Sequence, residues 1–388
     1  MLRRTLCRAA LAATVLLAGC SGGEQAAPAP GEEASADGPA AVKVAAILPL
    51  SGPTATYGEE TLGGLKMAME RLDGKDGVAI DLIFKDNKGD STETAKLVTQ
   101  VIKVDKAKAI IGAVASTNSI KGAKVAQENG IPMMTSASTN VAVTQKGDYI
   151  SRICFIDPVQ GKVLAKLALE DLGKKKAAVI VDKASDYSVG LADSFRKTFT
   201  AGGGEIVSEE TFTAGEVDFS AVITKITRSG ADVVFVPAYY GDVGPMLKQV
   251  GDRWKDLPVV AGDGIDSPDL YPLMGDYPGK IYMASHFAPD DTEPMVAGFV
   301  KAYKERYGKV PGTMAALGYD AGLALHDAIK RAGSDDPAAL KDAINSIEGL
   351  RGITGTITLN DERNADKDVV ILSLSPAGAT FFKRVSPS

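Results

Sequence analysis

The feature that most constrains this chain is a regular alternation of short apolar runs and amphipathic segments, which begins at Val42. Short runs rich in Val, Ile and Ala are typical of strands that are covered on both faces of a parallel sheet. The expected strands are 42–50, 79–85, 108–114, 131–135, 149–155, 177–182, 205–212, 232–239, 257–262 and 280–287. Between them, segments such as 58–72 and 91–105 carry apolar residues at helical spacing. The alternation predicts right-handed βαβ units and an α/β, doubly wound architecture.

The length of the chain adds a second constraint. A chain of 388 residues is too long for one ordinary core, and about ten strands divide naturally into two sheets. The last part has helical stretches and then two strand candidates, with no room for a third domain. These segments are 292–307, 314–332, 336–346, 353–359 and 369–375, followed by a short tail. We expect them to complete the two domains that precede them.

The N-terminus has the pattern of an export signal. Three arginines (Arg3, Arg4 and Arg8) precede an apolar segment, 9–18, that is too short to span a bilayer. The run Leu-Ala-Gly-Cys that ends at Cys20 resembles the lipobox of bacterial lipoproteins, in which this cysteine becomes the lipidated first residue. Cleavage next to an incidental cysteine is the alternative.

The residues after Cys20 are unsuited to a core, because 21–40 contain no bulky apolar side chain. We therefore expect a signal peptide over 1–19 and, over 20–41, the lipidated Cys20 and a disordered tether to the membrane. After processing, Cys154 is the remaining cysteine, so an intramolecular disulfide is not expected.

Several function classes lack their motifs. The net charge of −6 argues against a nucleic-acid partner. The turn after the first strand has no G-x-G-x-x-G and no Walker lysine, and no G-x-S-x-G elbow is present. The two histidines, His286 and His326, lack neighbours at metal-ligand spacing. We expect His326 to be packed or capping, and His286 has a minor chance of lining a cleft. The sequence thus predicts no enzyme, no cofactor and no metal.

Small hydroxyl residues follow two strands of the first half. Strand 108–114 leads into Ser116, Thr117 and Asn118, which begin a helix that continues to Glu128. Unpaired N–H groups at a helix N-terminus suit a carboxylate, although one such residue could simply cap the helix. The next strand leads into a second hydroxyl loop, 136–140. Two such loops could surround one carboxylate group.

In the second half, tyrosines and an aspartate follow the strands. Tyr187 comes just before a helix, and Tyr239 and Tyr240 follow strand 232–239. Asp263 lies between two glycines after strand 257–262, where it could accept from an ammonium group. A turn or cap role is the alternative for Asp263. Because the carboxyl ends of parallel strands meet at one sheet edge, these residues point to a ligand site.

Seven segments together resemble the branched-chain amino acid binding proteins, the leucine/isoleucine/valine-type, type I periplasmic receptors of ABC importers. They are LPLSGPTATYGEETLGGLKMA, GAVASTNS, PMMTSASTN, SDYSVGLADSF, PAYYGDVGPMLKQ, GDGIDSPDL and ALGYDAGLAL. The resemblance runs from about Val42 to the end. It implies two Rossmann-like lobes joined by three crossing segments that close on a ligand. The N-lobe would be 42–157 plus 286–358, and the C-lobe 158–285 plus 359–388.

The resemblance also implies a set of ligand-binding residues. The α-carboxylate ligands of the family fall on Ser116, the backbone of Ala137, and Thr139, with Ser138 in the same loop. The ammonium ligands fall on Tyr187 and on Asp263, where the leucine-type receptor has a glutamate, one methylene longer.

The side-chain end of the pocket would be lined by tyrosines. The residues implied there are Tyr57, Tyr239 and Tyr240, with Met314 a weaker candidate and Ser51 and Gly52 at the rim. The cysteine pair of leucine-type receptors is missing, which bears on stability more than on recognition.

The sequence therefore predicts a monomeric, extracytoplasmic receptor anchored by lipid, which captures an amino acid and delivers it to an ABC permease and ATPase. The expected ligand is branched-chain or otherwise aliphatic. Three alternatives remain: a receptor for an amide, urea or an aromatic acid, a ligand sensor without a transport role, and a hydrolase.

Overall fold

The computed structural model describes residues 41–72, 74–376 and 378–386 of the chain. The expected signal peptide and Cys20 lie outside the described residues, as does the expected tether apart from its last residue. Within the described part of the chain, no helix is both long enough and apolar enough to cross a membrane.

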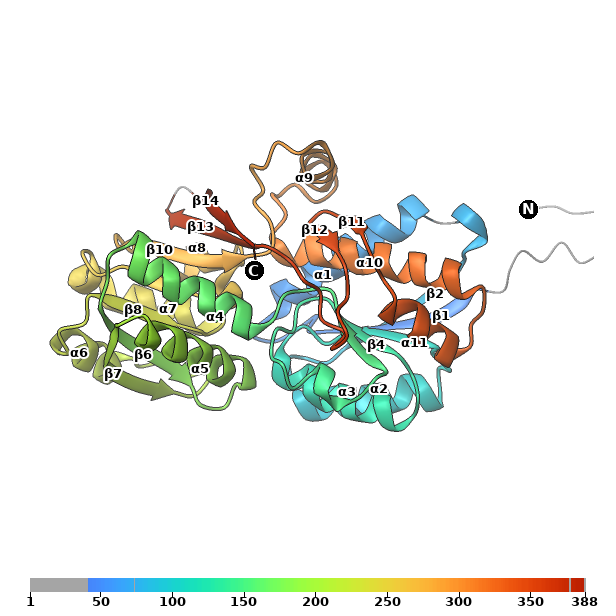
Figure 1. Cartoon of the computed structure of the whole chain (residues 1–388), viewed down its shortest axis with the longest axis horizontal. Coiled ribbons are helices and arrows are strands. Elements are labelled where there is room, and N and C mark those ends of the chain that lie inside the picture. Colours follow the sequence, from blue (N-terminus) through green and yellow to red (C-terminus); the bar gives the residue numbers. More distant parts are fainter. Residues whose placement is uncertain (1–40, 73, 377, 387–388) are drawn as a thin grey trace, which may run out of the picture. The chain divides into compact units, whose positions relative to one another are not determined.

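The first sheet consists of five parallel strands in the order β2-β1-β3-β4-β5. Figure 1 labels β1, β2 and β4 of this sheet. The strands are β1 (Val42–Leu48), β2 (Ile80–Asp86), β3 (Ala109–Gly112), β4 (Met133–Thr135) and β5 (Ile150–Arg152). The helices between them are α1 (Ala55–Leu72), α2 (Ser91–Lys103) and α3 (Ser116–Glu128). Along β1, Val44 and Ala46 belong to one buried apolar cluster, and Ala45 and Ile47 to another. Both faces of this sheet are therefore covered, as the continuous apolar runs predict.

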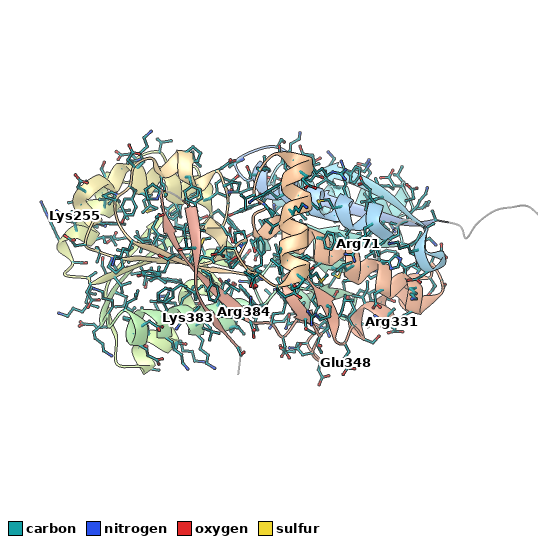
Figure 2. The ribbon with its side chains drawn as sticks, turned by 90° about the horizontal axis from the view of Figure 1, so that it is seen from above. Arg71, Lys255, Arg331, Glu348, Lys383 and Arg384 are labelled. Carbon is teal, nitrogen blue, oxygen red and sulfur yellow. The ribbon has the colours of Figure 1, made fainter. Side chains whose placement is uncertain are left out.

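The second sheet has the order β14-β13-β10-β9-β8-β6-β7, and β13 and β14 run antiparallel to their neighbours. The strands are β6 (Lys176–Asp182), β7 (Glu205–Phe212), β8 (Val233–Val236), β9 (Val259–Ala261), β10 (Ile281–Ser285), β13 (Val369–Ser375) and β14 (Gly378–Val385). The helices are α4 (Asp157–Lys166), α5 (Asp186–Ala201), α6 (Ser220–Arg228), α7 (Tyr240–Val250) and α8 (Leu270–Met274). On β14, Lys383 forms an ion pair with Asp171, and Arg384 forms one with Asp291. Figure 2 labels the two basic residues.

The remaining elements lie between β10 and β13. They are α9 (Pro294–Tyr307), α10 (Thr313–Ala332), α11 (Pro337–Asn345), β11 (Leu350–Gly352) and β12 (Gly355–Ile357). Helix α10 packs on α1 at very short range. A Cβ on Gly64 of α1 would lie 1.9 Å from the Ala315 carbonyl oxygen, and one on Gly318 of α10 would lie 2.1 Å from that of Thr61. Residues far apart in sequence therefore complete the first lobe.

The chain passes between the two sheets three times: after β5, after β10 and after β12. The architecture is α/β, with two doubly wound lobes joined by three crossing segments, as the sequence predicts.

The strand expected over 353–359 is present but shorter, as β12 (Gly355–Ile357), and residues 353–354 before it form a turn. The structure has an antiparallel hairpin there, in which Gly352 of β11 pairs with Gly355 of β12. The backbone N–H groups of Ile353 and Thr354, at the tip, donate to the Asp320 carboxylate at 2.6 and 2.9 Å. Gly355 has a φ of 103°, which an L side chain rarely adopts. A buried carboxylate on α10 thus holds the hairpin tip as a turn, and the strand begins only at Gly355.

Candidate functional site

The two hydroxyl loops of the first lobe lie side by side. The Asn140 N–H donates to Ser116 Oγ at 3.3 Å, and the Ser138 hydroxyl donates to the Val114 carbonyl at 2.6 Å. Ser116, Ser138 and Thr139 are each 1% exposed, and Ala137 is 5% exposed. The structure therefore brings the four residues expected at the carboxylate end into one buried region.

The start of α3 leaves hydrogen-bonding capacity open. Its N-cap residue is Ala115, and no side chain caps the helix, so the capping alternative for Ser116 and Asn118 does not hold. In the described part of the chain, Asn118 Nδ2 and Ser136 Oγ are buried without a hydrogen-bond partner. A helix N-terminus with free donors carries a partial positive charge that suits an anion.

A buried arginine fixes the second loop. The Arg152 guanidinium is fully buried and donates to the carbonyl oxygens of Ser138 and Asn140 at 2.5 and 2.8 Å. Burial holds the pKa of Arg152 below its usual value. Sequence reasoning missed this residue, because a lone arginine in an apolar run gives no sign of what it contacts.

The four expected tyrosines come from both lobes and pack against one another. The Tyr57 and Tyr240 rings meet edge to face at 4.8 Å, and those of Tyr187 and Tyr239 stack at 5.1 Å. The Tyr57 hydroxyl donates to the Gly264 carbonyl, and the Tyr187 hydroxyl accepts from the Gly264 N–H at 2.9 Å. Burial raises the pKa of Tyr57 and Tyr187 well above the usual range, so both hydroxyls stay protonated.

Further contacts join the lobes next to these rings. The Asn140 side-chain amide donates to the Asp186 carbonyl at 2.7 Å, and the Asp186 N–H donates to Thr117 Oγ1 at 3.0 Å. The N-termini of α3 and α5 therefore meet directly at the carboxylate end.

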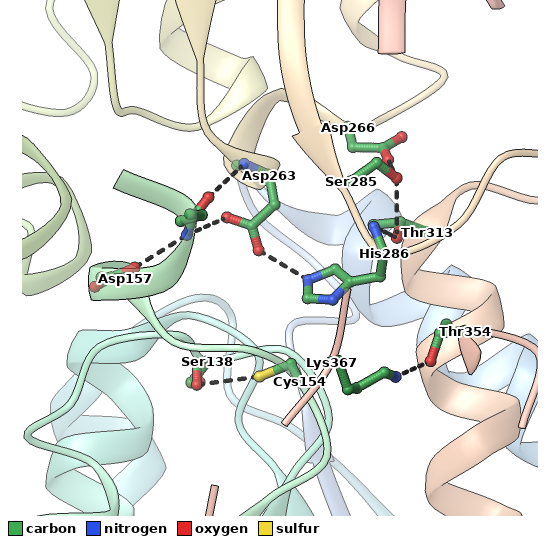
Figure 3. A network of polar contacts seen from close by, with 12 residues as sticks. Ser138, Cys154, Asp157, Asp263, Asp266, Ser285, His286, Thr313, Thr354 and Lys367 are labelled. Carbon is green, nitrogen blue, oxygen red and sulfur yellow. Dashed lines mark hydrogen bonds and ion pairs between the residues drawn. The ribbon is translucent and has the colours of Figure 1, made fainter. Parts of the chain in front are cut away.

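Asp263 lies in a short 3₁₀ turn directly after β9 and is 3% exposed. Its Oδ1 accepts from Gln160 Nε2 at 3.1 Å, and its Oδ2 lies 3.2 Å from His286 Nε2 (Figure 3). The His286 ring stacks on Phe155 at 3.8 Å, and burial holds the pKa of His286 below its usual value. His286 is therefore neutral at neutral pH, and Asp263 has no cationic partner in these bonds.

A second buried acid lies beside Asp263. Asp157 Oδ1 accepts from the same Gln160 amide at 3.0 Å, while its Oδ2 has no hydrogen-bond partner within the described residues. Burial raises the pKa of Asp157 to about 7. The region between the lobes thus holds two buried carboxyl groups whose oxygen atoms receive only some of the hydrogen bonds that they can accept, all from neutral donors.

Three candidates lie apart from these contacts. Ser51 and Gly52 are exposed, and the Ser51 hydroxyl donates to Asp86 at the end of β2, 2.6 Å away. Met314 is buried on α10. Among the residues that the structure describes, no group of three or more His, Cys, Asp or Glu side chains could hold a metal ion.

Gln160 and Asp157 went unnoticed in the sequence. Gln160 is separated from Asp263 by 103 residues, and no periodicity or motif links them. The arrangement as a whole offers donors at one end, a carboxylate at the other and aromatic rings between them.

Comparisons with known proteins show the family of the chain. A family model described as periplasmic binding protein matches residues 41–379. The Leu/Ile/Val-binding protein homolog 3 of Brucella melitensis is 29% identical over 327 residues, which cover 82% of this chain and 87% of the relative.

Two solved structures are similar over nearly their full length. The leucine binding protein LivK from Thermotoga maritima is 35% identical with a TM-score of 0.86, covering 89% of this chain and 99% of the other. A solute binding protein of an ABC transporter from R. palustris, in complex with benzoate, is 25% identical with a TM-score of 0.81, covering 89% and 97%.

Proposed function

Because the chain belongs to the periplasmic binding protein family, we propose that it captures an amino acid outside the cytoplasm and delivers it to an ABC importer. The similarity to leucine-type receptors confirms the resemblance that the sequence motifs indicated. Members of the family are solute receptors, which gives no support to the hydrolase alternative. The proposed ligand is branched-chain or otherwise aliphatic.

One observation supports this proposal most directly: the buried Asp263 carboxylate is bonded by the neutral side chains of Gln160 and His286. An ionised group without a countercharge is costly to bury, so a ligand that supplies an ammonium group would be strongly favoured there. The donors around Ser116 would then receive the ligand's carboxylate.

The proposed order of events follows from where these groups lie. The first lobe, with Ser116 and Thr139, would hold the carboxylate, and the second lobe would bring Tyr187 and Asp263 onto the ammonium group. Hydrogen bonds to charged groups contribute about 1.5–3 kcal/mol each, so four or five could support micromolar affinity after ordering costs. Ligand contacts to both lobes shift the equilibrium toward the closed state.

Titration calorimetry with leucine, isoleucine and valine tests the proposal. We expect binding, and we expect Asp263→Asn to weaken it at least tenfold because a charged partner is lost. Asp276→Asn, a change at an exposed aspartate of the same lobe, is the matched control and should leave affinity unchanged. Equal affinity of the wild type and Asp263→Asn would remove Asp263 from the site.

An aromatic acid is the second candidate ligand, because the R. palustris relative was solved with benzoate and four tyrosines line this site. A benzoate carries no ammonium group, so it would leave Asp263 unpaired. Heat on titration with benzoate and none with the three amino acids would favour this candidate.

A further inference from the structure

The Asp263 carboxylate is held at both oxygens. Gln160 Nε2 donates to Oδ1 at 3.1 Å, and His286 Nε2 lies 3.2 Å from Oδ2. Gln160 also accepts from the Asp263 backbone N–H through Oε1, at 3.3 Å. One glutamine thus fixes both the main chain and the side chain of this residue.

Both of these side chains are themselves immobilised. Gln160 is fully buried, and its amide also donates to Asp157 Oδ1 at 3.0 Å, which uses both of its N–H groups. His286 is 1% exposed, and its ring stacks on Phe155 with an interplanar angle of 16°. Gln160 is thus oriented by its hydrogen bonds, and His286 by burial and the stack on Phe155.

The two donors are neutral, so they orient the carboxylate without cancelling its charge. An arginine or lysine in either place would form an ion pair with Asp263 and compete with a cationic ligand. The groups that face His286 are Asp263 and Lys367, and the latter lowers the pKa of His286 further. Neither donor therefore places a countercharge on Asp263 that a cationic ligand would have to displace.

These donors also belong to the segments that cross between the lobes. Phe155 and Asp157 lie where the chain leaves β5 and enters α4, and Gln160 is in the first turn of that helix. His286 directly follows β10, at the second crossing. Asp263 is thus held by residues of two segments that join the lobes.

We propose that Gln160 and His286 are positioning residues that fix the Asp263 carboxylate for the ammonium group of the ligand without supplying a countercharge of their own. The inference rests on the proposed function, in which Asp263 receives that ammonium group. Fixed geometry lowers the ordering cost of binding, so loss of either donor weakens affinity even though neither residue is required to touch the ligand.

Four variants of the mature chain, titrated with L-leucine by calorimetry, test this role. Gln160→Met removes, at similar volume, its two hydrogen bonds with Asp263 and the one to Asp157. His286→Phe keeps the stack on Phe155 and removes the donor, whereas His286→Gln removes the stack and supplies a neutral N–H. Asp263→Asn reports on the acid itself, and thermal unfolding of each variant reports on folding.

We expect Gln160→Met and His286→Phe to weaken leucine binding about tenfold and His286→Gln to stay within about threefold of the wild type.

Wild-type affinity in both Gln160→Met and His286→Phe, with Asp263→Asn weakened, would overturn the positioning role alone. Wild-type affinity in His286→Phe together with a loss in His286→Gln would show that the stack on Phe155 matters and not the donor. If the wild type does not bind leucine, or Asp263→Asn binds it normally, the proposed function fails. If His286→Phe does not fold, Gln160→Met decides the question.

Discussion

At the scale of single residues, some members of the candidate site can be predicted from the sequence and others cannot. Tyr57, Tyr187 and Asp263 follow strand ends or begin helices, and the sequence pattern alone places them near one another. Gln160 and His286 contact Asp263 although they lie 103 and 23 residues away from it in the sequence. No sequence motif links them to Asp263. Local patterns specify which sheet edge a residue occupies, whereas side-chain partners across the interior depend on tertiary packing.

Glu60 on α1 provides a pH-dependent prediction. It is fully buried, its Oε1 accepts from the Gly312 N–H at 3.1 Å, and its Oε2 has no partner in the described part of the chain. Burial raises the pKa of Glu60 to about 8, from an ordinary value of 4.5, and Asp266 and Asp269 add to the shift. Between these two values the folded state binds one more proton than the unfolded state, so stability falls as pH rises.

We therefore expect Glu60→Gln to stabilise the protein more at pH 8.5 than at pH 5. Each pKa unit corresponds to about 1.4 kcal/mol, so half of the shift would already give about 2 kcal/mol. Urea unfolding at the two pH values measures the difference, and Glu59→Gln at the exposed neighbouring residue is the control. An identical gap between Glu60→Gln and the wild type at both pH values would contradict the argument.

At the scale of helices and strands, sequence periodicity located most elements to within a few residues. The β1 and β2 strands and the α3 helix lie where the alternation predicts them. Within 353–359 the pattern misplaced the start of the strand, because the Asp320 carboxylate of α10 holds residues 353–354 as a turn and β12 begins only at Gly355. That carboxylate is more than thirty residues away, outside any local window.

The packing of α1 on α10 leads to a prediction about glycines. A Cβ on Gly64 would lie 1.9 Å from the Ala315 carbonyl oxygen. This oxygen belongs to the backbone of α10, so it can move only if the helix moves with it. Gly298 in α9 is exposed, with nothing within 4 Å of a Cβ placed there. The same substitution should therefore have opposite effects at the two sites.

We expect Gly64→Ala to lower the free energy of unfolding by at least about 2 kcal/mol because the helices must separate. Gly298→Ala should raise it by up to about 1 kcal/mol through higher helix propensity. Denaturant unfolding of both variants is the measurement. A Gly64→Ala protein as stable as the wild type would mean that the two helices are not in close contact.

At the scale of the whole molecule, the family places the chain outside the cytoplasm, and we propose that Cys20 anchors it by lipid. In that case the wild type should fractionate with membranes when expressed in a bacterium, since several acyl chains on one cysteine attach stably. Cys20→Ala should release it into the extract, while Cys154→Ala, a change at a buried thiol, should not. If Cys20→Ala associates with membranes as strongly as the wild type, Cys20 is not the lipid anchor. Ordinary signal cleavage is then the remaining interpretation of the N-terminal segment.

The contact between α1 and α10 has a consequence for biosynthesis. Helix α1 is among the first elements that a ribosome makes, and the helix that covers it is translated only when most of the chain already exists. Until then its apolar face has no native partner, so the nascent N-terminal half cannot complete its own core. A polypeptide built in this order reaches a stable state late, which suits passage through a narrow secretion channel before the final shape is acquired.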